Sequence, residues 1–149
     1  MGIKIIERNK RASFDFFLLE KYEAGIVLQG TEVKSLRAGK VSLTEAYVHL
    51  DEFGEVWLYN MNIAQYEFGN IHNHEEGRKR KLLLHKAQAA EIYHRMKAEK
   101  LTIIPTQIYF KDSKVKVEIA LAKGKKQHDK RQTEAKRDVE RKLRRGDYD

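Results

Sequence analysis

Apolar and polar residues alternate in short segments along the first 122 positions, as expected for strands that bury one face. The segments are rich in aromatic and β-branched residues, and Gly or charged residues separate them, so they predict strands. The predicted strands are Ser13–Leu18, Tyr22–Leu28, Ala46–Leu50, Glu55–Tyr59, Thr102–Phe110 and Val115–Ala122. Short turns join the third to the fourth and the fifth to the sixth, which favours antiparallel hairpins.

The segment from His85 to Lys100 has a helical period, because its apolar residues recur every three or four positions. The helix that this spacing predicts carries Ala89, Ile92, Tyr93 and Met96 on one face. Thr31–Arg37 is a weaker helical candidate.

Strand aromatics such as Trp57 alternate with polar neighbours, and we expect them to face the core. Five to seven short strands with an inserted helix in about 120 residues favour a small antiparallel barrel, since closure protects the edges of a sheet.

Composition narrows the class of protein. A chain of 149 residues is long enough for a single core. The chain has no cysteine, which excludes disulfides, thiolate zinc sites and thiol nucleophiles. Its apolar runs are far shorter than the roughly 20 residues of a membrane span. We therefore expect a cytoplasmic protein without a membrane partner. We also expect it to be monomeric.

The net charge is +8, and residues 123–149 carry most of it, with eleven Lys or Arg against six Asp or Glu. Few apolar residues lie in this tail, so we expect it to be disordered when free. Ala135, Val139 and Leu143 nevertheless recur at helical spacing, so that a binding surface could order the tail as a helix.

Three basic runs are candidate nucleic-acid sites. In the first, Gly30–Lys40, the side chains of Lys34, Arg37 and Lys40 suit phosphate oxygens. The second, Arg78–Lys81, has four consecutive cations that we expect to reach solvent, followed by three leucines that we expect in the core. In the third, Ala122–Arg131, His128 could stack on a base among cations. Ordinary solvated turns are the alternative for each run.

Two patterns suggest metals, and we favour neither. His72–Glu76 offers imidazole and carboxylate groups, but a metal site needs three or four convergent ligands. Glu32 and Lys34 match the Glu-x-Lys fragment of some metal-dependent nucleases. That alternative needs a further carboxylate, for which Asp15, Glu20 and Glu45 can only be nominated. We expect no metal, cofactor or catalytic residue.

The basic runs occur in an order that resembles the SmpB family, the SsrA-binding proteins of bacterial trans-translation. The resemblance covers nearly the whole chain and rests on Asn9–Ala12, Tyr22–Ile26, Gly30–Lys40, Arg80–Leu84 and Ala122–Arg131. It implies a mainly β fold, an OB-like antiparallel barrel of six to seven strands with about three helices, and a basic C-terminal tail. The barrel would span residues 1–122, and residues 123–149 would be disordered when free and helical on the ribosome.

The resemblance also implies a non-catalytic function. The protein would bind the tRNA-like domain of transfer-messenger RNA and deliver it to stalled ribosomes, in one complex with elongation factor Tu (EF-Tu) and the alanylated RNA. The tail would occupy the decoding centre and the downstream mRNA channel of the small subunit. A structural ribosomal protein with a basic extension is the remaining alternative.

Site residues follow from the matching motifs. Asn9, Glu23 and Leu83 would form the RNA face with Lys116, and Lys10, Arg11, Lys34 and Arg37 are the motif cations expected there. An acidic residue fits such a face only as an acceptor for base amino groups or sugar hydroxyls. In the tail, the decoding-centre residues would be Lys123, Lys125, Lys126, His128, Asp129, Lys130 and Arg131.

Overall fold

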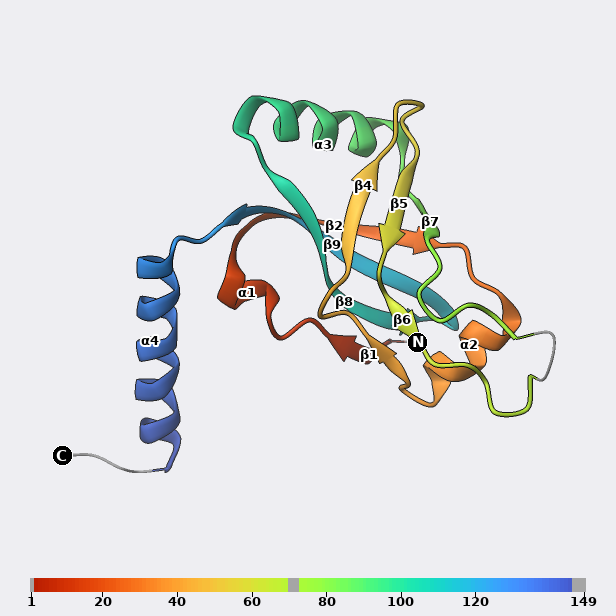
Figure 1. Cartoon of the computed structure of the whole chain (residues 1–149), viewed down its shortest axis with the longest axis horizontal. Helices are drawn as coiled ribbons and strands as arrows, with labels where there is room; N and C mark the ends of the chain where they lie inside the picture. Colours follow the sequence, from red (N-terminus) through yellow and green to blue (C-terminus); the bar gives the residue numbers. More distant parts are fainter. Residues whose placement is uncertain (1, 70–72, 146–149) are drawn as a thin grey trace.

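Antiparallel strands close into a six-stranded barrel in the computed structural model, which describes residues 2–69 and 73–145 (Figure 1). Side chains at positions 127–129, 140 and 142–145 fall outside that description. The ring runs through β8 (Thr102–Lys111), β4 (Tyr47–Leu50), β5 (Val56–Tyr59), β7 (Arg80–Leu83), β2 (Phe16–Ile26) and β9 (Lys114–Gly124), and β9 pairs back with β8. Strand β1 (Ile3–Arg8) adds to β8, and β3 (Val41–Ser42) pairs with β6 (Asn62–Ile63).

The predicted mainly β class and antiparallel barrel are confirmed. Helices α1 (Ala12–Asp15), α2 (Gly30–Arg37) and α3 (Lys86–Glu99) accompany the barrel, and α4 (Gln127–Arg145) follows it. The prediction of two strands at Ser13–Leu18 and Tyr22–Leu28 was wrong. Ser13, Phe14 and Asp15 belong to α1. Phe16–Leu18 and Tyr22–Ile26 belong to one strand, β2, which has an irregular register between Leu18 and Lys21 and ends before Val27 and Leu28.

The barrel interior is filled by alternate residues of its strands. Val48, Val56, Leu58, Ile103 and Ile119 are among the buried side chains. Helix α3 covers one end of the barrel with Ile92, which is fully buried, whereas Tyr93 is 44% exposed. Tyr93 lies at the edge of the predicted apolar face of this helix, which explains why it is more exposed than Ile92.

Strands β8 and β9 are the longest hairpin of the fold. The turn consists of Asp112 and Ser113, both with positive φ, since Lys111 pairs directly with Lys114. Such two-residue turns match the twist of antiparallel strands. The pairing register of β8 with β9 shifts between Pro105 and Gln107. Proline has no backbone N–H to donate, so it is accommodated at such an irregularity without the loss of a regular ladder hydrogen bond.

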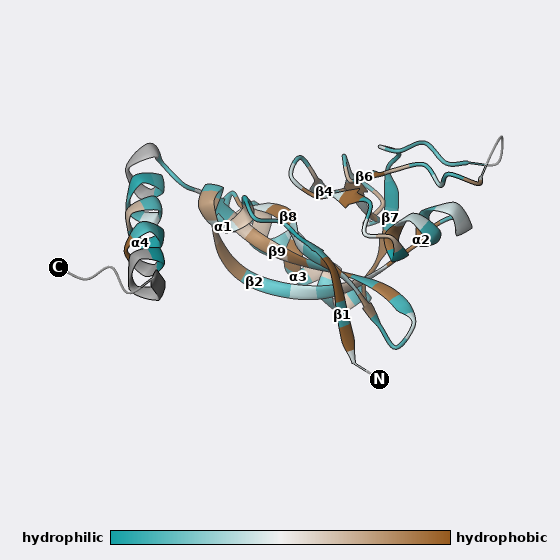
Figure 2. Ribbon diagram, turned by 90° about the horizontal axis from the view of Figure 1, so that it is seen from below, coloured by the Kyte–Doolittle hydropathy of each residue, from teal (hydrophilic) through white to brown (hydrophobic). Residues whose placement is uncertain are grey.

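Helix α4 contacts α1 and lies apart from the barrel, and most of the residues coloured along its ribbon are hydrophilic (Figure 2). Of the helices in the described part of the chain, none is both long and apolar enough to cross a membrane. Strand β9 ends at Gly124, two positions after the predicted end of the barrel. The division into a barrel and a tail that is disordered when free stays a prediction.

Candidate nucleic-acid interface

Glu23 presents a carboxylate on the outside of the barrel. The hydroxyl of Tyr109 donates a hydrogen bond of 2.5 Å to its Oε2, and Lys111 Nζ lies 3.3 Å from Oε1. The hydrogen bond from Tyr109, assisted by Lys111 and by the charge of Lys116, lowers the pKa of Glu23 below its usual value. Because the side chain is still 37% exposed, an ionised acceptor is held in place at the surface.

Leu83 is an exposed apolar residue beside this carboxylate. It pairs across strands with Gly25, and 53% of its surface is accessible. A Cβ at Gly25 would lie 3.4 Å from the Cβ of Leu83, in van der Waals contact with it, so the two positions pack directly against each other. Its neighbour Leu82 is 2% exposed, so only part of the predicted leucine core is buried.

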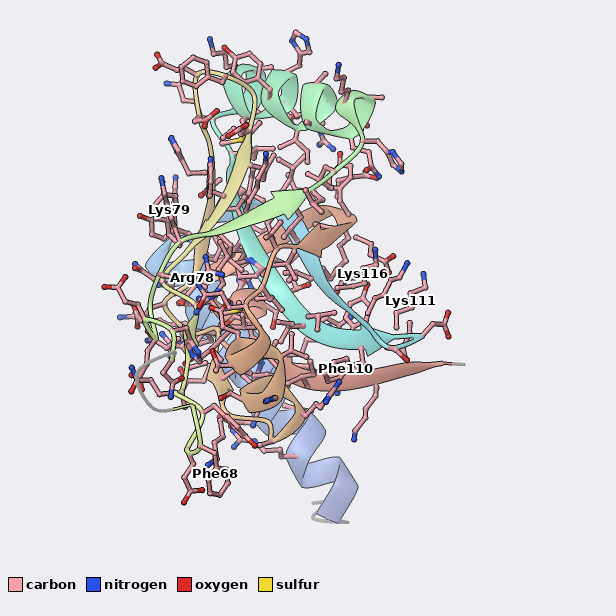
Figure 3. All side chains as sticks on the ribbon, turned by 90° about the vertical axis from the view of Figure 1, so that its right-hand side faces the viewer. Phe68, Arg78, Lys79, Phe110, Lys111 and Lys116 are labelled. Atoms are coloured by element: carbon pink, nitrogen blue, oxygen red, sulfur yellow. The ribbon has the colours of Figure 1, made fainter. Side chains whose placement is uncertain are left out.

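Lys116 completes the same face. It pairs with Gly25 on one side and with Tyr109 on the other, so the register places Glu23, Leu83 and Lys116 on adjoining strands. Figure 3 shows Lys116 and Lys111 projecting from the same side of the molecule. The fold therefore brings together three of the residues implied by the resemblance on this face.

Asn9 has a structural position between β1 and α1. Its Nδ2 donates to the carbonyl of Pro105 over 3.0 Å, and its backbone N–H donates to Thr106 over 2.8 Å. Lys10 is exposed, whereas Arg11 lies 3.3 Å from Asp15. An RNA contact of these three residues stays a prediction, and Asn9 in addition fixes the path of the chain.

Lys34 and Arg37 lie on α2. Lys34 Nζ lies 5.2 Å from the centre of the Tyr66 ring, which in turn packs edge-on against Phe68. Arg37 and Phe68 are exposed. A cation and two aromatic rings therefore share this end of the molecule.

Glu32 is buried and has both oxygens occupied. Arg80 Nε donates to Oε2 over 2.5 Å, Arg78 Nη2 donates to Oε1 over 2.6 Å, and the backbone N–H of Gln29 donates to Oε1 over 2.7 Å. Burial alone would raise the pKa of Glu32, but the hydrogen bonds from Arg78, Gln29 and Arg80 outweigh it and lower the pKa. The Glu-x-Lys motif thus has a structural carboxylate that is closed to a metal.

The buried ion pair also corrects the expectation that all four cations of Arg78–Lys81 reach solvent. Arg80 is 0% exposed, and it donates further hydrogen bonds to the carbonyls of Met61 and Glu76. A guanidinium can be buried in this way because its fixed fork of donors finds a carboxylate and several carbonyls.

His74, from the other metal-like pattern, is also buried. Its Nε2 lies 2.8 Å from the carbonyl of Ile63 and its Nδ1 lies 2.8 Å from the hydroxyl of Thr31. Because a carbonyl only accepts, Nε2 carries the proton and donates. His72 lies outside the described residues, and none of the described residues forms a group of three metal-binding side chains.

The aromatic residues of β4 and β5 correct a further expectation. Val48, Val56 and Leu58 fill the interior, so Trp57, Tyr47 and Tyr59 face outward. Alternation identifies two faces of a strand without saying which one is buried, and aliphatic side chains occupy the inner face here. The prediction that Trp57 lies in the core was wrong.

The first tail residues contact α1. Lys125 Nζ donates to the carbonyl of Ser13 over 2.8 Å, and Lys130 Nζ lies 3.3 Å from Asp15 Oδ1. Lys123, Lys126 and Arg131 are exposed. The backbone of His128 and Asp129 is helical, but their side chains lie outside the described residues.

Tyr109 and Lys111 are functional candidates that the motif comparison missed. Burial, followed by the hydrogen bond to Glu23, raises the pKa of the Tyr109 hydroxyl and keeps it a donor. The two residues lie two positions apart on one strand, which places them on the same face and was the available signal. Their pairing with Glu23 depends on the register of the barrel, which the sequence does not give.

The chain is similar to proteins of one family. The family model described as SmpB protein matches residues 6–147. The SsrA-binding protein of Halothermothrix orenii is 52% identical over 97% of this chain and 92% of its own length. That of Bifidobacterium adolescentis is 54% identical over 89% of this chain and 83% of its own length.

A solved structure is similar as well. It is described as "tmRNA-SmpB: a journey to the center of the bacterial ribosome", and its matching chain is 48% identical to this one. The TM-score is 0.68, and the match covers 81% of this chain and 85% of the other.

Proposed function

The chain belongs to the SmpB protein family, and on this basis we propose that it binds the tRNA-like domain of transfer-messenger RNA and delivers that RNA to stalled ribosomes in trans-translation. The relatives are named for binding SsrA, and the similar solved structure is described as a tmRNA-SmpB assembly. In this proposal the chain acts by binding, without a catalytic step.

The observation that carries the proposal is the fixed carboxylate of Glu23 between an exposed leucine and two lysines. An ionised acceptor can receive hydrogen bonds from base amino groups or ribose hydroxyls. Lys111 and Lys116 suit phosphates, and Leu83 offers an apolar contact to an unstacked base. Together these groups recognise a folded RNA by shape and base edges.

The RNA face is tested by measuring the affinity of the full chain for the isolated tRNA-like domain. Glu23→Gln removes the charge while keeping the size, and we expect a loss of about 10- to 100-fold, since hydrogen bonds to charged groups contribute about 1.5–3 kcal/mol. Glu99→Gln is the matched control, because Glu99 pairs with Arg95 on the exposed surface of α3. Equal affinities of the two variants would contradict the proposed face.

For the tail, we propose that its cations face phosphates in the decoding centre and the downstream mRNA channel, with His128 stacked on a nucleotide among Lys123–Arg131. Helix α4 is consistent with this role because it is predominantly hydrophilic. Replacing Val139 and Leu143 with Asp is expected to impair tagging on stalled ribosomes while sparing RNA binding. Unchanged tagging would refute the role of the helix.

The proposed delivery complex holds one copy of this chain with the alanylated RNA and elongation factor Tu. Sedimentation of the mixed components is expected to show one species with one copy of each. A species lacking either protein, or holding two copies of this chain, would contradict this stoichiometry.

A further inference from the structure

A row of aromatic side chains covers the outer face of β4 and β5. Tyr47 pairs with Tyr59, and their rings stack with centres 5.3 Å apart and planes 8° apart. His49 lies edge-on to Tyr59, with ring centres 6.3 Å apart, and pairs with Trp57. Tyr47 is 43% exposed and His49 is exposed, so rings of this row are accessible to a ligand.

Cations border the same row. Lys79 Nζ lies 4.5 Å from the centre of the Trp57 ring, and Lys81 is the cross-strand neighbour of Trp57 on β7. The nearby carboxylates have partners: Glu55 lies 3.3 Å from Lys81, and Asp51 accepts hydrogen bonds from the Trp57 indole and from backbone N–H groups. The surface therefore combines stackable rings with Lys79, for which the described part of the chain shows no carboxylate partner.

The row is continuous with the proposed RNA face. Lys81 and Leu83 lie two positions apart on β7, and both point outward because Arg80 and Leu82 are buried. Gly25 pairs with Leu83 and with Lys116, so one outer surface runs from the aromatic row to the carboxylate of Glu23. Figure 3 shows β7 running between Lys79 on one side and Lys116 on the other.

We propose that the outer face of β4, β5 and β7 is a stacking platform for unpaired nucleotides of the same RNA that the Glu23 face binds. The proposal rests on the proposed function, because that RNA identifies the occupant. Aromatic rings beside a basic groove are the usual means by which OB-like barrels hold unpaired bases. Base stacking contributes about 1–3 kcal/mol per base, whereas an exposed cation–π contact contributes about 0.5–1 kcal/mol. A base therefore displaces Lys79 from the Trp57 ring, and the freed ammonium group binds a phosphate.

Trp57 makes this platform directly observable, because it is the single tryptophan of the chain. The test titrates the full chain with the tRNA-like domain labelled with fluorescein, and follows fluorescein anisotropy and tryptophan emission together. We expect Trp57 emission to be quenched with the same midpoint as the anisotropy change. Saturated binding with constant emission would overturn the platform while leaving the proposed function intact.

Two variants strengthen the test. Tyr47→Ala is expected to weaken binding about 5- to 150-fold, the range set by one lost base stack. Phe17→Ala is the matched control, because Phe17 is also 43% exposed but lies at the far end of β2, and its affinity should stay within about twofold of the parent. Equal effects of the two substitutions would overturn the assignment.

Lys79→Gln gives a readout that a folding defect would not mimic. Loss of one phosphate contact lowers the slope of log affinity against log salt by about 0.7 for a single strand. An unchanged slope would overturn the role of Lys79. No RNA binding by the parent chain would refute the proposed function itself, and quenching seen only after ribosomes are added would assign the platform to ribosomal RNA instead.

Discussion

The burial of the Glu32 carboxylate predicts a large loss in the free energy of unfolding when its charge is removed. Its side chain is 0% exposed and receives two guanidinium groups and a backbone N–H. Glu32→Gln keeps the shape but replaces one acceptor oxygen with a donor, so Arg80 loses its counter-charge while it stays buried. Breaking a buried ion pair in this way costs about 3–5 kcal/mol, a large part of the roughly 5–15 kcal/mol that stabilises a domain.

The assay is urea unfolding followed by Trp57 emission. With a slope of about 1–3 kcal/mol per molar urea, the loss lowers the midpoint by at least about 1 M. Glu99→Gln removes the same charge from an exposed pair on α3, whose contribution is about 0.3–0.5 kcal/mol. Equal midpoints for the two variants would refute the structural role of Glu32.

The same carboxylate sets a pH dependence. The pKa of Glu32 is lowered in the folded state, so its contribution to stability is complete above the unfolded value of about 4.3. This contribution is lost as the pH falls through the folded-state pKa. The acid-induced loss of stability is therefore expected to be shallower in Glu32→Gln, and parallel curves for parent and variant would contradict the pKa shift.

Three further predictions concern other residues. His74→Ala leaves the half-buried hydroxyl of Thr31 and the carbonyl of Ile63 without their imidazole partner and is expected to cost about 1–3 kcal/mol in urea unfolding, whereas an unchanged midpoint would contradict its structural role. Lowering the pH from neutral to about 5 should leave the affinity ratio of parent to Glu23→Gln constant, because Glu23 stays ionised there, and a ratio that falls toward one would show the opposite. Lys130→Ala removes a partly exposed pair with Asp15 and should change stability by less than about 1 kcal/mol, so a larger loss would mean that the tail is part of the barrel's core.

The sequence predicted those helices and strands whose apolar residues repeat regularly within one short segment of the chain. Helix α3 and the β8–β9 hairpin follow from the spacing of apolar residues and from a short connection between two predicted strands, and both lie within a residue or two of their predicted bounds. The connection predicted as Lys111–Lys114 is shorter in the structure, where only Asp112 and Ser113 form the turn. Strand β7 was missed because two of its four residues are charged, and the charge of Arg80 is neutralised by a residue 48 positions away.

The site was predictable only in part, because contacts between residues far apart in the sequence leave no local pattern. Glu23 and Leu83 came from matching motifs, but the hydrogen bond that fixes Glu23 comes from Tyr109, 86 positions later in the chain. The orientation of Trp57 was not predictable, because a period of two describes an inward and an outward face equally well. Only closure of the barrel determines which of them is inside.

Photo-crosslinking from two equally accessible positions tests the central claim most directly. Leu83 is 53% exposed and Val139 is 57% exposed, so each can carry a photoreactive side chain in the full-length protein. After irradiation with transfer-messenger RNA and stalled ribosomes, we predict crosslinks from position 83 to the tRNA-like domain. Crosslinks from position 139 should reach small-subunit RNA or mRNA. Crosslinks from position 139 to the tRNA-like domain, with none from position 83, would contradict the proposal that the barrel binds the tRNA-like domain and the tail binds the ribosome.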